Sequence, residues 1–294
     1  MSSLSVRPVR VSSFLLVFAG VLWGTGGIAG DMLRGAAGLS PVSVAAYRLL
    51  VGGGVASLVV VRQGSVLFGR SAVVRVLVSG GLLAQFQAAY QVAVALVSVS
   101  LATLVTIGCV PLFVAIVSGV RERRVPGVTT LLAVGGSVVG LVLLSGGAVG
   151  VGGWRLVGGV AMSLSAGAGF SLLTLVTARP LPGQHVVASV GLLLGGLFLV
   201  PFGLVAGMGF GPSVSVVVLV VYLGLVPTAL AYGAYFLGLR SAHPTAAALA
   251  TMLEPLTATI LAVAFYGETL SVAGVVGVVL IVAGVGVYYL KPAG

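Results

Sequence analysis

Residues 250–270 read ATMLEPLTATILAVAFYGETL, an apolar run interrupted near its start by Glu254 and Pro255 and followed, after a glycine, by Glu268. Few residues of the chain are charged: 6% of its 294 residues, against about 25% in an average soluble protein. Apolar stretches of about eighteen or more residues recur from one end to the other, as is typical of helices that cross a roughly 30 Å hydrocarbon layer. The sequence therefore predicts an all-α polytopic membrane protein, with Glu254 deep in the bilayer.

Other classes of protein fit the composition less well. A transmembrane β-barrel would alternate apolar and polar residues in short segments, and that alternation is absent. The net charge of +10 does not indicate nucleic acid, because the basic residues are scattered and form no aromatic-laced patch. Cys109 is the single cysteine and reads as a small buried hydrophobe. The histidines, His185 and His243, lack companions with metal-ligand spacing, so we expect no metal and no cofactor.

Ten spans are predicted, with charges, prolines and polar clusters between them: 12–30, 41–61, 72–92, 98–119, 126–144, 155–177, 185–206, 214–236, 244–265 and 271–290. An even number of spans puts both ends of the chain on one side of the membrane. The basic residues on that side would be Arg7, Arg10, Arg62, Arg70, Arg75, Arg121, Arg123, Arg124, Arg179, Arg240 and Lys291. Only Arg34 and Arg155 would lie on the other side. The positive-inside rule then predicts a cell (inner) membrane protein with cytoplasmic N- and C-termini.

An internal duplication is visible in the pattern of apolar residues and prolines. The stretch ALVSVSLATLVTIGCVPLF, from residue 95, aligns with GLRSAHPTAAALATMLEPL, from residue 238, and one inserted residue brings Pro111 onto Pro255. We predict two halves of five spans, residues 1–150 and 151–294. Because five is odd, the second half enters the membrane in the opposite sense, as in the inverted repeats of secondary transporters.

Several motifs resemble those of a known family: Trp23-Gly24, Tyr47-Arg48, the helix starts ALVSVSLATLV and GLRSAHPTAAALA, PLF and EPL, and a final GETLS before a glycine-rich helix. Together they resemble the EamA-type drug/metabolite transporter superfamily over essentially the whole chain, and within it YddG-like exporters of aromatic and other amino acids. The resemblance implies ten helices in two inverted five-helix repeats around a central cavity lined by both halves. The first half departs from the pattern, because no glutamate precedes Pro111 and RERRVPG stands in place of GETLS.

Polar and aromatic residues inside the spans are the candidates for that cavity. Gln87, Tyr90 and Gln91 share one helical face, while Gln85 points elsewhere. This face would line a cavity or bond to a neighbouring helix. The eighth span carries further tyrosines that suit either a cavity wall or the aromatic belt at a bilayer interface. The predicted cavity residues are Trp23, Tyr47, Gln85, Gln87, Tyr90, Gln91, Tyr222, Tyr232 and Tyr235.

Arg48 and Glu254 are the charged residues placed well inside spans. A charge at mid-membrane costs about 3 kcal/mol on insertion scales, so it is usually paired or functional. One hypothesis is structural: the two residues pair, or bond to backbone groups freed by a proline. The other is that Arg48 docks a substrate carboxylate while Glu254 receives a proton or the substrate amine. The hinges are predicted at Pro111, Pro227 and Pro255, where a proline interrupts helical hydrogen bonding.

These features predict a secondary transporter that works by alternating access and exports amino acids, including aromatic ones. Another metabolite or a drug-like cation is the alternative substrate, with Glu254 as the only candidate anion for a cation. A channel would share the architecture, whereas a membrane enzyme would need acids, bases or metal ligands converging at one depth. Four carboxylates and two histidines are scattered instead, so we predict no enzyme. The expected partners are a small-molecule substrate and the lipid bilayer, with no nucleic acid, and the chain is expected to act as a monomer.

Overall fold

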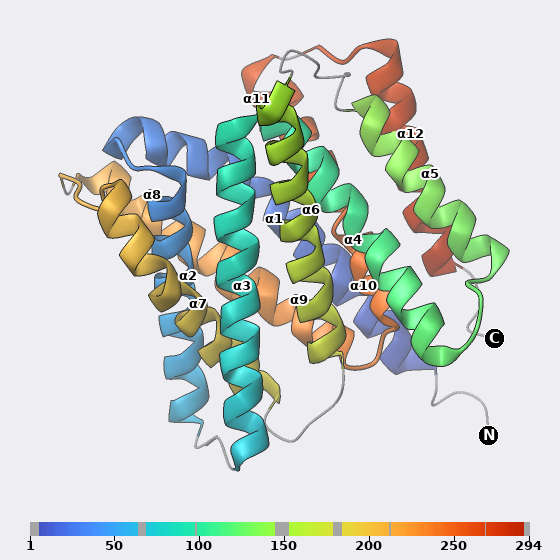
Figure 1. Cartoon of the computed structure of the whole chain (residues 1–294), viewed down its shortest axis with the longest axis horizontal. Coiled ribbons are helices and arrows are strands. Elements are labelled where there is room, and N and C mark those ends of the chain that lie inside the picture. Colours follow the sequence, from blue (N-terminus) through green and yellow to red (C-terminus); the bar gives the residue numbers. More distant parts are fainter. Residues whose placement is uncertain are drawn as a thin grey trace.

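A computed structural model describes residues 6–63, 69–97, 99–144, 153–178, 184–211, 213–267 and 269–290, and all the regular elements in these ranges are helices (Figure 1). The predicted boundary between the halves, at residues 150 and 151, lies outside the described residues, as do Glu268 and Lys291.

The helices of the first half are α1 (Val6–Ala37), α2 (Pro41–Arg62), α3 (Arg70–Leu96), α4 (Val99–Glu122) and α5 (Val128–Leu144). The second half contains α6 (Gly153–Thr177), α7 (Gln184–Ala206), α8 (Val214–Gly224), the π-helical segment η1 (Leu225–Leu230), α9 (Ala231–Leu239), α10 (Pro244–Ala250), α11 (Leu253–Tyr266) and α12 (Val272–Leu290). Because η1 joins α8 to α9 and a short turn joins α10 to α11, the described elements form ten rods at the predicted positions.

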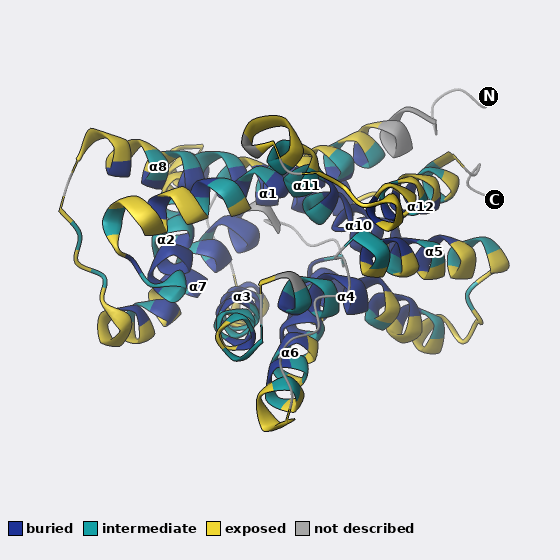
Figure 2. Ribbon diagram, turned by 90° about the horizontal axis from the view of Figure 1, so that it is seen from above, coloured by how far each residue is buried: buried dark blue, intermediate teal, exposed yellow. Residues whose placement is uncertain are grey.

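Length and apolar character identify most of these rods as membrane spans. Among the described residues, nine helices are long and apolar enough to cross a membrane, and α5, with 17 residues, is shorter. Large hydrophobic side chains such as Phe14, Phe202 and Phe265 are exposed on the surface. Viewed from above, exposed residues lie on the outside of the bundle and buried residues face its centre (Figure 2). This arrangement confirms the predicted class, a multi-pass α-helical membrane protein. An apolar surface of this extent is stable in contact with lipid but is unfavourable in contact with water.

Close helix packing depends on small residues at the contacts. In α1, a Cβ added at Gly24 would lie 2.6 Å from the carbonyl oxygen of Glu254 and 2.5 Å from Cβ of Thr257. Gly140 of α5 and Gly277 of α12 approach each other's carbonyl oxygens in the same way, and these helices lie side by side at one edge of the bundle (Figure 1). Small residues allow the two backbones to come this close. In lipid the hydrophobic effect does not bring helices together, so their association depends on such close packing.

The remaining strong contacts join the two halves of the chain around the centre. α1 packs on α8, α9 and α11, and α2 packs on α7 and α8. α6 packs on α3 and α4, and α7 packs on α3. Each half therefore surrounds elements of the other, and the central space is shared between them.

The three predicted hinge prolines have different local structures. Pro111 lies inside α4, which continues through it as one helix. Pro227 lies within the π-helical segment η1. Pro255 is the third residue of α11, in a first turn whose N–H groups have no intrahelical partner in any case. The break in this span falls just before it, at Thr251 and Met252.

Candidate functional site

A cavity of about 180 Å³ lies among helices from both halves. Asp31, Arg34 and Pro41 line its mouth, together with Val94 and Val99 at the junction of α3 and α4. These residues lie near the helix ends remote from the start of α1. The cavity therefore opens on the side of the bundle opposite the N-terminal end of α1.

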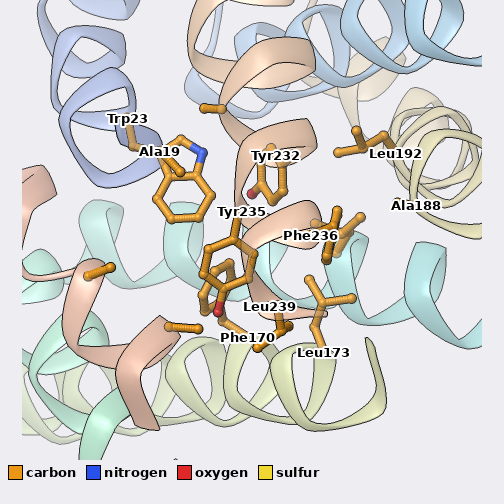
Figure 3. Close-up of a cluster of buried hydrophobic side chains, with 14 of the residues drawn as sticks. Ala19, Trp23, Phe170, Leu173, Ala188, Leu192, Tyr232, Tyr235, Phe236 and Leu239 are labelled. Atoms are coloured by element: carbon orange, nitrogen blue, oxygen red, sulfur yellow. The ribbon is translucent and has the colours of Figure 1, made fainter. Parts of the chain in front are cut away.

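The cavity is lined by aromatic rings from three helices, those of Trp23, Phe170 and Tyr232, which we call its aromatic floor. Figure 3 shows these rings close together in a buried hydrophobic cluster. The ring of Trp23 in α1 lies 5.8 Å from that of Phe170 in α6 and 5.1 Å from that of Tyr232 in α9, centroid to centroid. Behind these rings, Tyr235 and Leu239 are 0% and 1% exposed. The bundle is thus packed tightly between the cavity and the end where α9 terminates.

Further contacts hold that closed end together. His243, at the start of α10, lies 3.0 Å from a carboxylate oxygen of Glu122, the last residue of α4. The hydroxyl of Tyr289 in α12 donates to the carbonyl oxygen of Ala246 at 2.8 Å. These contacts join α4 of the first half to the ninth rod, and the ninth rod to the tenth, at the end of the bundle that carries the start of α1.

One wall of the cavity is the polar face of α3. Gln87, Tyr90 and Gln91 all line the cavity. Tyr90 shares a hydrogen bond of 2.6 Å with the hydroxyl of Thr103 in α4. Within the described part of the chain, the amides of Gln87 and Gln91 make no hydrogen bond to protein. Their donors and acceptors therefore face the cavity.

The two intramembrane charges also line the cavity but do not pair with each other. Arg48 donates from Nε to Oγ1 of Thr228 at 3.2 Å, and from Nη2 to the carbonyl oxygen of Pro227 at 3.2 Å. The Glu254 carboxylate has no hydrogen-bond donor among the described residues, and no Arg48–Glu254 ion pair within 4.0 Å occurs there. Of the structural roles foreseen for Arg48, the hydrogen bond to freed backbone is present and the ion pair is not.

Four of the predicted cavity residues are absent from the cavity lining and instead bond to other segments of the chain. The amide nitrogen of Gln85 donates to the backbone oxygen and the hydroxyl of Ser165 at 3.0 and 2.9 Å. Tyr47 donates to the carbonyl oxygen of Met208 at 2.7 Å, and Tyr222 donates to the hydroxyl of Thr25 at 2.9 Å. Tyr235 shares a hydrogen bond of 2.7 Å with Thr174 beneath the floor. Neither Tyr232 nor Tyr235 lies in an interfacial belt, because both are buried.

Several lining residues were not foreseen, including Phe86, Phe170, Thr103 and Thr106. Phe86 lies between Gln85 and Gln87 in the same span. Phe170 lies in the first span of the second half, as Trp23 lies in the first span of the first half.

A multi-pass helical bundle with a polar cavity between its halves belongs to the class of membrane solute transporters. The chain belongs to the EamA-like transporter family, which matches residues 11–146 and again residues 155–290. It is similar to the uncharacterized transporter YwfM of Bacillus subtilis (strain 168), with 27% identity over 293 residues that cover 96% of this chain and 95% of that protein. An uncharacterized transporter of Clostridium kluyveri is 24% identical over 172 residues, which cover 56% of this chain and 55% of that one.

The fold has also been seen in a solved crystal structure. That protein aligns with a TM-score of 0.80 and 22% identity, and the alignment covers 94% of this chain and 96% of the other. The solved structure shows the shared fold, and the family membership identifies this chain as a membrane transporter.

Proposed function

We propose that the protein is a secondary transporter that exports amino acids, including aromatic ones, by alternating access across the cell (inner) membrane, with both termini cytoplasmic. The observation that carries this proposal is the placing of Arg48 and Glu254 in one cavity without an ion pair between them. An amino acid has the complementary groups, because its carboxylate can bind Arg48 and its amine can bind Glu254.

The size and walls of the cavity support a small amphipathic solute. Its volume of about 180 Å³ is below the roughly 300–1,000 Å³ of pockets for drug-sized ligands. Trp23, Phe170 and Tyr232 offer rings for stacking on an apolar side chain. A drug-like cation, the alternative substrate, would bind Glu254 but would leave the charge of Arg48 unmatched.

We further propose that the chain consists of two inverted five-helix repeats, residues 1–150 and 151–294. The double match to the EamA-like family supports this division. The helix contacts support it too, since exchanging each rod with the rod five places along converts one contact into another. The packing of α1 on α11 corresponds to that of α6 on α4, and the packing of α2 on α8 corresponds to that of α7 on α3.

In this proposal the cavity is seen in its outward-facing state. Its mouth lies beside Asp31 and Arg34, whereas the aromatic floor and the Glu122–His243 contact close the opposite side. The π-helical segment around Pro227 and the break before Pro255 are the places where the second half would bend, and Pro111 would serve in the first half. Because both halves belong to one chain, the transporter would work as a monomer in the bilayer, without a cofactor, a metal or nucleic acid.

The test is a counterflow assay in proteoliposomes with a panel of labelled amino acids, with protein-free liposomes as the control. We expect saturable exchange in which aromatic amino acids compete best. No competition by any amino acid would overturn the substrate assignment. Flux that does not saturate and shows no exchange would indicate a channel instead.

A further inference from the structure

The bend in the eighth rod leaves two carbonyl groups without their usual donors. Proline has no N–H, so Pro227 cannot donate to the carbonyl oxygen of Leu223, four residues before it. The N–H of Ala231 bonds to the oxygens of Val226 and Thr228 and passes over that of Pro227. A π-helical turn inside an α-helix skips one carbonyl in this way.

Side chains supply both missing donors. The hydroxyl of Thr228 donates to the carbonyl oxygen of Leu223 at 2.8 Å. Arg48 donates from Nη2 to the carbonyl oxygen of Pro227, and from Nε to Oγ1 of Thr228. The Thr228 hydroxyl is therefore both a donor to the helix and an acceptor from Arg48, and it is fully buried.

These contacts leave one edge of the guanidinium group free. A guanidinium has five N–H groups, and two of them are used here. No protein atom in the described ranges accepts the other three, and Arg48 lines the cavity. Two fixed contacts on one edge determine the plane of the group and hence the direction of the free N–H groups.

We propose that Thr228 is a positioning residue, which holds the free edge of the Arg48 guanidinium in the orientation that binds a carboxylate. This inference rests on the proposed function, in which Arg48 receives the substrate carboxylate. A planar, two-pronged contact to a carboxylate depends on orientation more than the attraction of a point charge does. Loss of the Thr228 hydroxyl should therefore weaken carboxylate binding even though the charge stays in the cavity.

The packing around Thr228 offers a matched pair of variants. A Cβ added at Gly52, one turn from Arg48 in α2, would lie 2.7 Å from the Thr228 methyl group, so that methyl fills the space beside the helix. Thr228→Val keeps the methyl group and replaces the hydroxyl by a second methyl, whereas Thr228→Ser keeps the hydroxyl and removes the methyl. Thr259→Val is the control, because its hydroxyl donates to the Pro255 carbonyl oxygen at 2.8 Å in α11, outside the cavity lining.

Binding to the purified protein should be measured with L-phenylalanine, with 3-phenylpropionate, which has only the carboxylate, and with 2-phenylethylamine, which has only the amine. A hydrogen bond to a charged group is worth enough to change affinity by about tenfold. We expect Thr228→Val to bind the two carboxylates about tenfold more weakly and the amine unchanged, while Thr228→Ser and Thr259→Val bind all three as the wild type does. An equal loss for all three ligands would overturn the positioning role.

A second measurement needs no substrate. Phenylglyoxal modifies accessible arginine side chains, and mass spectrometry of the peptide that contains Arg48 reports the rate at that residue alone. We expect several-fold faster modification in Thr228→Val than in the wild type, Thr228→Ser or Thr259→Val, because one edge of the guanidinium is released. Equal rates in all four proteins would overturn the proposal.

The two measurements separate this inference from the proposed function. If the wild type binds none of the three ligands, the amino-acid assignment fails, and the modification rates still decide the role of Thr228. If Thr228→Val does not fold, Thr228→Ala also removes the hydroxyl and takes its place in both measurements.

Discussion

Arg48 of α2 donates to the carbonyl oxygen of Pro227 in η1 at 3.2 Å, so a cation from the first half of the chain satisfies a backbone group freed in the second. An unsatisfied backbone group in the hydrocarbon core costs several kcal/mol. A charge at that depth costs about 3 kcal/mol on insertion scales. The contact reduces both costs at once, and it also makes the bend in the eighth rod depend on a residue that faces the cavity.

Replacing Arg48 by lysine should abolish most transport without preventing folding. An ammonium group is a compact charge and cannot reproduce the planar fork that contacts Thr228 and Pro227 while facing the cavity. Amino-acid counterflow should fall by about tenfold or more, in proportion to the loss of a charged hydrogen bond. Arg155→Lys is the control, because Arg155 donates to the Ala95 carbonyl oxygen at the exposed end of α3. Counterflow by Arg48→Lys at the wild-type rate would contradict the assigned role.

Glu254→Gln should separate the amine-binding role from proton coupling. The amide keeps the shape of the carboxylate and removes its charge, so binding of L-phenylalanine should weaken by about tenfold or more. Binding of 3-phenylpropionate, which has no amine, should not weaken. Uptake into liposomes at two pH values provides the second readout. Unchanged, pH-independent transport by the variant would exclude a proton-carrying role, and unchanged phenylalanine binding would exclude the amine contact.

Gly24→Ala should destabilise the contact between α1 and α11. The new Cβ would lie 2.6 Å from the backbone oxygen of Glu254, and neither backbone can retreat without moving a helix. Overpacking of this kind costs about 1–3 kcal/mol. Thermal unfolding in detergent should show a lower midpoint for this variant. Gly35→Ala, in the same helix with nothing within 4 Å of the added Cβ, should unfold like the wild type.

Cysteine labelling should show which side of the cavity is open. Cys109 is the sole cysteine, so Cys109→Ala gives a protein free of thiols. In that background, Val94→Cys at the mouth should react quickly with a maleimide, and Leu239→Cys, at a site 1% exposed in the wild type, should react slowly. Addition of a transported amino acid should speed the reaction of Leu239→Cys as the cavity alternates. A labelling rate at Leu239→Cys that no substrate changes would count against alternating access.

The positions of the spans could be predicted because hydropathy is a local property. Each of the ten rods coincides with an apolar segment of the sequence that is bounded by charges, prolines or polar clusters. Trp23, Gln87 and Tyr90 were placed on the cavity by helical periodicity and by their rarity in apolar surroundings, and the structure brings them together there. Gln85 was also predicted to line the cavity, although helical periodicity places it off this face, and in the structure it bonds to Ser165 instead.

Other features of the site depend on partners that are distant in the chain. Tyr47, Tyr222 and Tyr235 have the same character as Tyr232, but each forms a hydrogen bond to a distant part of the chain: Tyr47 to the segment after α7, and the other two to α1 and α6. Pro111 and Pro255 have equivalent positions in the two halves. The sequence therefore did not predict that α4 would be continuous while the ninth rod is divided into α10 and α11. A hinge at Pro227 and a bond from Arg48 to freed backbone were both foreseen, but the π-helical form of the turn was not, nor that the partner of Arg48, 179 residues away, would be the carbonyl oxygen of Pro227.

The sequence by itself determined that this is a multi-pass helical membrane protein with a duplicated pattern of spans and two charges among them. Local hydropathy decides these matters, because each helix must satisfy its own backbone in lipid before it meets a neighbour. Only the tertiary structure decided that Glu254, beside Pro255 in the interrupted run, faces a shared cavity while Arg48 bonds to the bent eighth rod. These contacts depend on which helices meet across the two halves. The sequence separation between such partners follows no regular spacing, so local patterns do not predict it.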